Sequence, residues 1–116
     1  MGASKKKDYP NEELLERYEN LIAEFPKVER KGKTMPYTSV NGHMFSFLDK
    51  EGRLSLRLKE NMRNELIEKY KAELSVQHGR IMKEYLIIPK ILLGNFKDLK
   101  GYFKASYDYT CSLKPK

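Results

Sequence analysis

Apolar side chains recur at helical spacing near the start of the chain, over residues 14–25. Pro10 precedes this segment, and the acidic residues at positions 12 and 13 suit the first turn of a helix. Pro26 follows the last apolar position and lacks the backbone donor that a continuing helix needs. The pattern therefore predicts an amphipathic helix over this segment.

The hydrophobic period shortens to two between residues 35 and 58, which is typical of strands. Pro36 indicates an edge strand, because proline cannot donate to a ladder of hydrogen bonds. Asn41-Gly42 suits a two-residue turn in which both residues adopt positive φ, and such a turn predicts a hairpin. The predicted register pairs Val40 with His43, Thr38 with Phe45 and Pro36 with Phe47.

A second turn around residues 49–52 extends the hairpin to three strands, and its register follows if the loop is even in length. Phe47 then lies opposite Leu54, Phe45 opposite Leu56 and His43 opposite Leu58. Directly opposed residues point to the same face, so one face of this meander should join the core. The predicted core face holds Val40, Thr38, Phe45, Phe47, Leu54, Leu56 and Leu58, and the outer face holds Met35, Tyr37, Ser39, Met44, Leu48, Arg53, Ser55 and Arg57.

Helical spacing returns over residues 59–70 and again from Phe96 to Leu113, with two strands expected between these helices around His78-Gly79. The pairing of these two strands stays open, because the apolar run at residues 85–88 does not alternate. The predicted fold class is α+β. We expect two layers, an antiparallel sheet with helices on one face, in the order α-β-β-β-α-β-β-α.

Length and composition limit the classes of protein that this chain can form. Its 116 residues suffice for one core, so we expect a single domain over residues 9–116 after a basic, disordered tail at residues 1–8. The chain is too apolar for a disordered protein, and no apolar run approaches the roughly 20 residues of a membrane span. The single Cys111 and the lack of a secretory signal favour a soluble cytoplasmic protein without a membrane partner.

The residue patterns of catalysis, metal binding and nucleotide binding are missing from the sequence. Cys111 lies near the end of the last predicted helix, without the signature of an activated nucleophile. His43 and His78 lie at turns and lack the spacing of a zinc site. The glycines are isolated and form no phosphate-binding loop. We therefore expect no catalytic residue, no metal and no cofactor, and a protein that is not an enzyme.

A formal net charge of +7 and a pI near 9.4 favour an anionic partner. Along the third predicted strand, alternate residues point the same way about 6.6 Å apart, so its cations form a row that a phosphate backbone could follow. An aromatic ring beside such cations suits the stacking of bases. The candidate nucleic-acid-binding residues are Lys31, Lys33, Arg53, Arg57, Lys59 and Tyr37.

The same outer face carries apolar side chains, which a fully solvated face would not need. Methionine, tyrosine and arginine are the residue types enriched in protein interfaces. Met35, Met44 and Leu48 are therefore candidates for a protein contact, either in a homodimer or with a regulatory partner. Both kinds of partner, nucleic acid and protein, stay open at this level.

Two segments resemble known families. The stretch TMPYTSVNGHMFSFLDKEGRLSLRL, followed by a helix, resembles the TfoX N-terminal domain family, whose core is a three-stranded meander after an N-terminal helix. The ending YFKASYDYTCSLKPK is similar to that of the related YjbR/MmcQ proteins, which end in a helix with a Ser-Tyr pair and a short basic tail. Together these resemblances cover residues 11–116.

The resemblance implies a two-layer α+β domain with an antiparallel sheet, no cofactor and no catalytic residues to transfer. It also implies an association with DNA and with the regulation of transcription and competence. We therefore expect a small non-enzymatic binding domain whose partner is DNA. A protein-interaction module that binds no nucleic acid is the alternative.

Overall fold

The structure is a computed structural model of the chain, and it describes residues 11–116. The predicted basic tail at residues 1–8 lies outside the described residues. The described part contains nine helices and strands. They are α2 (Glu12–Ala23), β1 (Tyr37–Val40), β2 (His43–Leu48), β3 (Leu54–Arg57), α3 (Glu60–Tyr70), β4 (Leu74–Gln77), β5 (Arg80–Ile87), α4 (Lys90–Leu93) and α5 (Phe96–Cys111).

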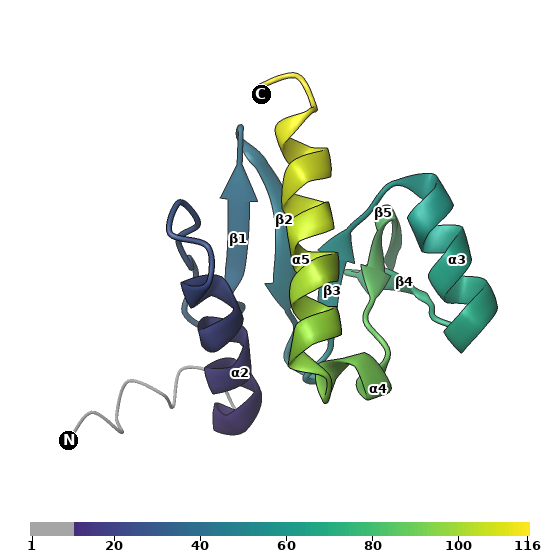
Figure 1. Cartoon of the computed structure of the whole chain (residues 1–116), viewed down its shortest axis with the longest axis horizontal. Coiled ribbons are helices and arrows are strands. Elements are labelled where there is room, and N and C mark those ends of the chain that lie inside the picture. Colours follow the sequence, from purple (N-terminus) through teal and green to yellow (C-terminus); the bar gives the residue numbers. More distant parts are fainter. Residues whose placement is uncertain (1–10) are drawn as a thin grey trace.

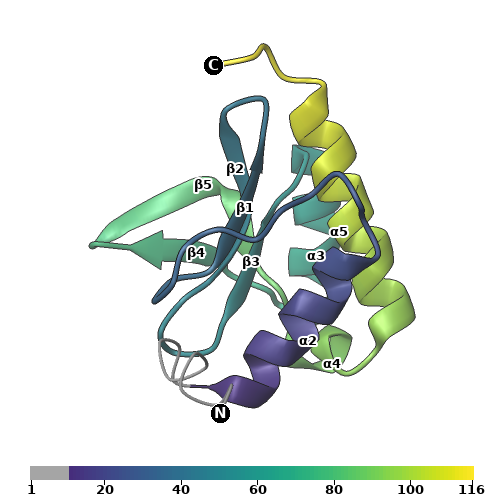
Figure 2. The same cartoon turned by 90° about the vertical axis from the view of Figure 1, so that its left-hand side faces the viewer.

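The strands form one antiparallel sheet in the order β1-β2-β3-β5-β4. Helices α2, α3 and α5 lie on one side of this sheet, and the β4–β5 hairpin curves away from them (Figure 1, Figure 2). The predicted α+β class is confirmed, and the short helix α4 is an addition to the predicted order. β1 lies at an edge of the sheet, as Pro36 predicted, whereas β5 lies between β3 and β4.

Helix α2 begins at a capped terminus and buries one stripe of side chains. The Asn11 side chain accepts a hydrogen bond from the Leu14 backbone N–H (3.0 Å), which satisfies a donor that the first turn leaves free. Leu15, Tyr18, Leu21 and Ile22 point into the core. Tyr18 is 2% exposed, and its hydroxyl is hydrogen-bonded to Ser46 on β2 (2.6 Å). Burial raises the pKa of the Tyr18 phenol, and its hydrogen bonds oppose this rise.

An extra residue in β2 changes the register that the sequence predicts. Val40 pairs with His43 as expected, but Thr38 pairs with Ser46 while Ser39 pairs with Met44. Phe45 therefore has no partner on β1, which is the arrangement of a β-bulge. Phe45 and Ser46 consequently both point to the helical side.

Contacts with two different helices confirm this orientation. The Phe45 ring lies 5.3 Å from the Phe103 ring of α5, centroid to centroid. Ser46 contacts α2 through Tyr18 and is also hydrogen-bonded to Thr38 on β1. A chain of three buried hydroxyl groups thus connects α2, β2 and β1.

The bulge reverses the faces of the residues that follow it. Leu48 pairs with Leu54 and is fully buried in the core, so the prediction that Leu48 lies on an open outer face is wrong. Phe47 pairs with Ser55 instead of Leu54, and it points away from the helices. The predicted pairs of Phe45 with Leu56 and Phe47 with Leu54 are wrong by one residue, because the loop between Leu48 and Leu54 has five residues, an odd number. On β3, however, the leucines do face the core as predicted.

A second small cluster covers the outer face of the sheet. The Phe47 side chain is 0% exposed although it faces away from the helices. The ring of Tyr85 on β5 lies 5.9 Å from the Phe47 ring, and the Tyr85 hydroxyl donates to the Met44 carbonyl on β2 (2.7 Å). Tyr85 thus crosses the outer face of β3 and encloses Phe47.

The chain end is attached to the β1–β2 turn. Asn41 and Gly42 both have positive φ (57° and 79°), as the two-residue turn predicts. The Asn41 side chain donates to the Cys111 carbonyl (3.0 Å), and His43 Nε2 donates to the Lys114 carbonyl (2.8 Å). His43 is therefore a strand-starting residue held by backbone, as its position beside the turn suggests.

Replacement of Phe47 by alanine should lower the free energy of unfolding by about 3–5 kcal/mol, because it empties an enclosed site. Phe96→Ala is the matched control, since the Phe96 side chain is 43% exposed and should contribute less than about 1 kcal/mol. Urea denaturation measures both values. Equal losses in the two variants would show that Tyr85 does not enclose Phe47.

Candidate nucleic-acid interface

One end of the sheet collects a cation from every strand. Because neighbouring strands are antiparallel, the start of β1, the end of β2, the start of β3, the end of β5 and the start of β4 lie at the same end. Backbone hydrogen bonds continue the ladders to this end, from Leu48 to Pro36 and from Ile88 to Leu54. The cations beside these strand ends are Lys33 (β1), Lys50 (β2), Arg53 (β3), Lys90 (β5) and Lys71 (β4). We call these five side chains the basic end of the sheet.

The four lysines of the basic end are free to meet an anion. All four are exposed, and within residues 11–116 none of them forms an ion pair. Arg53 is held instead by two carboxylates, Asp49 at 2.9 Å and Glu51 at 3.1 Å. The hydrogen bond to Asp49 raises the pKa of the Arg53 guanidinium. The positive charge of this end therefore comes chiefly from its lysines.

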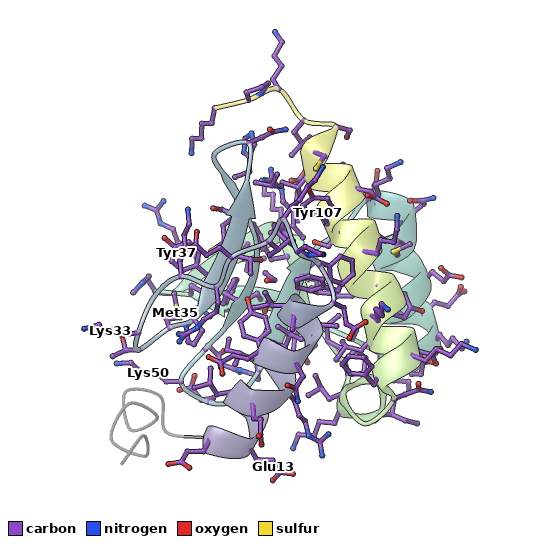
Figure 3. The ribbon with its side chains drawn as sticks, turned by 60° about the vertical axis from the view of Figure 1, so that its left-hand side comes forward. Glu13, Lys33, Met35, Tyr37, Lys50 and Tyr107 are labelled. Carbon is purple, nitrogen blue, oxygen red and sulfur yellow. The ribbon has the colours of Figure 1, made fainter. Side chains whose placement is uncertain are left out.

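A closed loop fixes the backbone around Lys33. Lys31 and Tyr37 exchange two backbone hydrogen bonds of 2.8 Å each across the loop. Gly32 has φ +80°, and a Cβ there would lie 2.5 Å from the Met35 carbonyl oxygen, so only glycine fits. Figure 3 shows Lys33 and Lys50 projecting from the same corner of the molecule.

Lys31 and Tyr37, the other predicted residues of this loop, lie along the edge of β1. Lys31 Nζ donates to the Ser39 hydroxyl (3.4 Å), which draws its charge toward the middle of the strand. Tyr37 is half-buried, its backbone pairs with Phe47 of β2, and its ring lies against Gly32. Met35 is half-buried close by. These residues flank the basic end and are not part of its row.

Two surface depressions meet within the basic end. The first has a volume of about 340 Å³ and lies between Arg53, Lys71 and Lys90. The second, of about 230 Å³, continues from it toward Arg17. Both are lined by Lys90 and by Gly52, whose φ of +80° turns the chain between β2 and β3.

Of the predicted row of cations along β3, Arg53 lies just before the strand, Arg57 is its last residue and Lys59 lies beyond it, at the start of α3. Arg57 forms an ion pair of 2.6 Å with Glu84, and its side chain is only 17% exposed. Its guanidinium also lies 5.6 Å from the centre of the Tyr85 ring. Lys59 precedes α3 and lines a separate depression of about 290 Å³ between α3 and α5.

The candidates for a protein contact do not form one open apolar surface. Leu48 is buried in the core, as described above, and Met44 is half-buried with its carbonyl bonded to Tyr85. Met35 lies in the loop before β1. The exposed large apolar side chains lie elsewhere, namely Ile67, Val76, Ile81, Ile91 and Phe96.

Three elements meet at Glu84, beside the depression of Lys59. Glu84 on β5 accepts hydrogen bonds from Arg57 Nε (2.7 Å) and from the hydroxyl of Tyr109 on α5 (3.0 Å). Burial raises the pKa of the Glu84 carboxyl, but the bonds from Arg57 and Tyr109 outweigh burial and hold this pKa below its ordinary value. The Glu84 carboxylate accepts from both Arg57 and Tyr109, so this cluster connects β3, β5 and α5.

Sequence reasoning missed Lys50, Lys71 and Lys90. They are distant in sequence, and only the strand order brings them to one end of the sheet. Their signal in the sequence is that each lies just outside a strand. This signal can be used only when the pairing of β3 with β5 is known, and the apolar run at residues 85–88 left that pairing open.

The described residues show neither a metal centre nor a membrane-spanning helix. Among residues 11–116, no three His, Cys, Asp or Glu side chains are placed to hold a metal ion. No helix in the same range has the length and apolarity needed to cross a membrane. Comparison of the chain with family models, curated proteins and solved structures gives no match in any of the three. The site is therefore described by its geometry alone: exposed cations lie at one end of an antiparallel sheet.

Replacement of Glu84 by glutamine should lower the free energy of unfolding at pH 7 by about 1–3 kcal/mol, because it removes a charge-assisted bond to Arg57. A pKa lowered by folding means that ionised Glu84 stabilises the folded chain at neutral pH and loses this effect as the pH falls through that pKa. The gap between wild type and variant should therefore narrow below about pH 4. Urea denaturation at several pH values measures this difference in unfolding free energy.

Glu68→Gln is the control for this experiment, because Glu68 is exposed on α3 and forms no ion pair within residues 11–116. Its effect on unfolding should be small at every pH. A gap for Glu84→Gln that stays constant from pH 7 to pH 3 would contradict the electrostatic role of Glu84.

Proposed function

We propose that this chain is a non-enzymatic nucleic-acid-binding domain of the TfoX N-terminal type, and that it binds the phosphate backbone of DNA through the basic end of the sheet. The observation that supports this proposal is the row of Lys33, Lys50, Lys71 and Lys90, exposed and free of ion pairs within residues 11–116. Its single cysteine suits a reducing cytoplasm, and regulation of gene expression is the role that the resemblance suggests.

The length of the row suits a polyanion better than a small ion. Neighbouring strands lie about 4.8 Å apart, so five strand ends span about 19 Å. Over that distance one strand of duplex DNA presents about five or six phosphates. Lysines on flexible stems can each reach one phosphate as the backbone passes, and the resulting affinity depends on salt.

The alternative, a protein contact through Met35, Met44 and Leu48, has less support. Leu48 is buried, and Tyr85 bonds to Met44 across the outer face. An interface centre needs contiguous exposed apolar surface. The outer face of the sheet instead contains its own enclosed cluster around Phe47.

Double replacement of Lys50 and Lys90 by glutamine should weaken binding to a short duplex DNA and flatten its salt dependence. The slope of log affinity against log salt should fall in magnitude by about 0.9 for each phosphate that the variant no longer neutralises. Fluorescence anisotropy at several salt concentrations measures both quantities. The matched control is Lys83→Gln with Lys114→Gln, which removes equal charge from exposed positions away from the basic end.

Two results would overturn the proposal. In the first, the control pair lowers affinity and slope as much as Lys50→Gln with Lys90→Gln, so that only net charge matters. In the second, removal of residues 1–8 abolishes binding while the double variant at the basic end binds like wild type. The folded domain would then not be the part that binds DNA.

A further inference from the structure

We infer that the depression between Arg53, Lys71 and Lys90 receives an unpaired nucleobase, so that the preferred ligand is a single strand or a strand with an extruded base. The inference rests on the proposed function, because the phosphates on either side of that base would meet the basic end. It adds a second kind of contact, with a base, to the contacts with the backbone.

The size of the depression suits a ligand of nucleoside size. Its volume is about 340 Å³. Small-molecule sites have volumes of roughly 300–1,000 Å³, so this one lies at the lower limit. A flat heterocycle with its sugar fits such a volume, whereas the edge of an intact duplex would stay outside it.

The lining has the chemistry that a base requires. Ile87, Ile88 and Leu93 contribute apolar surface, and Tyr70 contributes an aromatic side chain. Apolar and aromatic surfaces bind the faces of an unstacked base. Glu73 also lines the depression, and its carboxylate can accept hydrogen bonds from the amino groups of a base.

The cations lie where the adjoining phosphates would pass. Lys71 and Lys90 line the same depression as the apolar groups, beside Arg53, whose charge is paired with Asp49 and Glu51. Lys71 ends α3 in the left-handed conformation (φ 58°), and its N–H donates to the Ile67 carbonyl (2.8 Å), which fixes the start of its side chain. An unpaired base can therefore enter beside these positive groups, while a paired base is held in its stack.

The test compares an eight-nucleotide single-stranded DNA containing one 2-aminopurine with a duplex of the same length, in anisotropy titrations of the full chain. The single strand should bind about 5- to 150-fold more tightly, as expected for one base bound on apolar and aromatic side chains. The fluorescence of 2-aminopurine should also change on binding.

Ala72→Phe fills the depression without a change of charge, because Ala72 is part of its lining. This variant should lose the preference for the single strand and keep the affinity and salt slope for duplex. Ala105→Phe is the matched control, since Ala105 lines the separate depression beside Lys59. It should leave the preference unchanged.

A measurement on the wild-type chain does not depend on whether the variants fold. Titration of dAMP into the wild-type chain should shift the amide resonances of Ala72 and Ile88 and leave that of Ala105 in place. Equal affinity for single strand and duplex, or a preference that survives in folded Ala72→Phe, would overturn the inference and leave the proposed function standing. Binding of neither DNA would overturn both.

Discussion

The extra residue in β2 determines how the two layers of this domain are joined. Because Phe45 has no partner on β1, it and Ser46 both point to the helices, and they contact α5 and α2 respectively. A regular strand would present only one of them to the helical layer. The bulge at Phe45 also exchanges the faces on which the following residues of β2 lie. Leu48 therefore lies in the core, and Phe47 lies on the opposite face of the sheet.

This reversal leaves both faces of the sheet occupied at β2 and β3. The helices cover one face, and Tyr85 encloses Phe47 on the other while it bonds to the backbone of β2. Arg57 lies over the same ring and is neutralised by Glu84, so its charge stabilises the fold and is not open to a partner. The ends of the sheet remain as surfaces on which several strands can present side chains together.

The order of the strands brings the cations of the basic end together. Antiparallel pairing turns a start of one strand and an end of the next toward the same side, and here each of these positions has a cation nearby. The depression at this end forms where the chain leaves β5 and enters β4, so apolar residues of the sheet border lysines of its ends. Backbone-binding charge and a base-sized recess thus arise from the same strand order.

Local patterns in the sequence determined the elements of this protein. The 3.6-residue period predicted its long helices, and Asn41-Gly42 predicted the first turn, because positive φ at both positions needs these residue types. Tertiary structure decided the register after Phe45. A bulge breaks the alternation of inward and outward side chains, and its position is known only once the helices that contact Phe45 and Ser46 are in place. It also decided the site. Charges at positions 33, 50, 71 and 90 become neighbours only through long-range strand pairing, which no local spacing encodes.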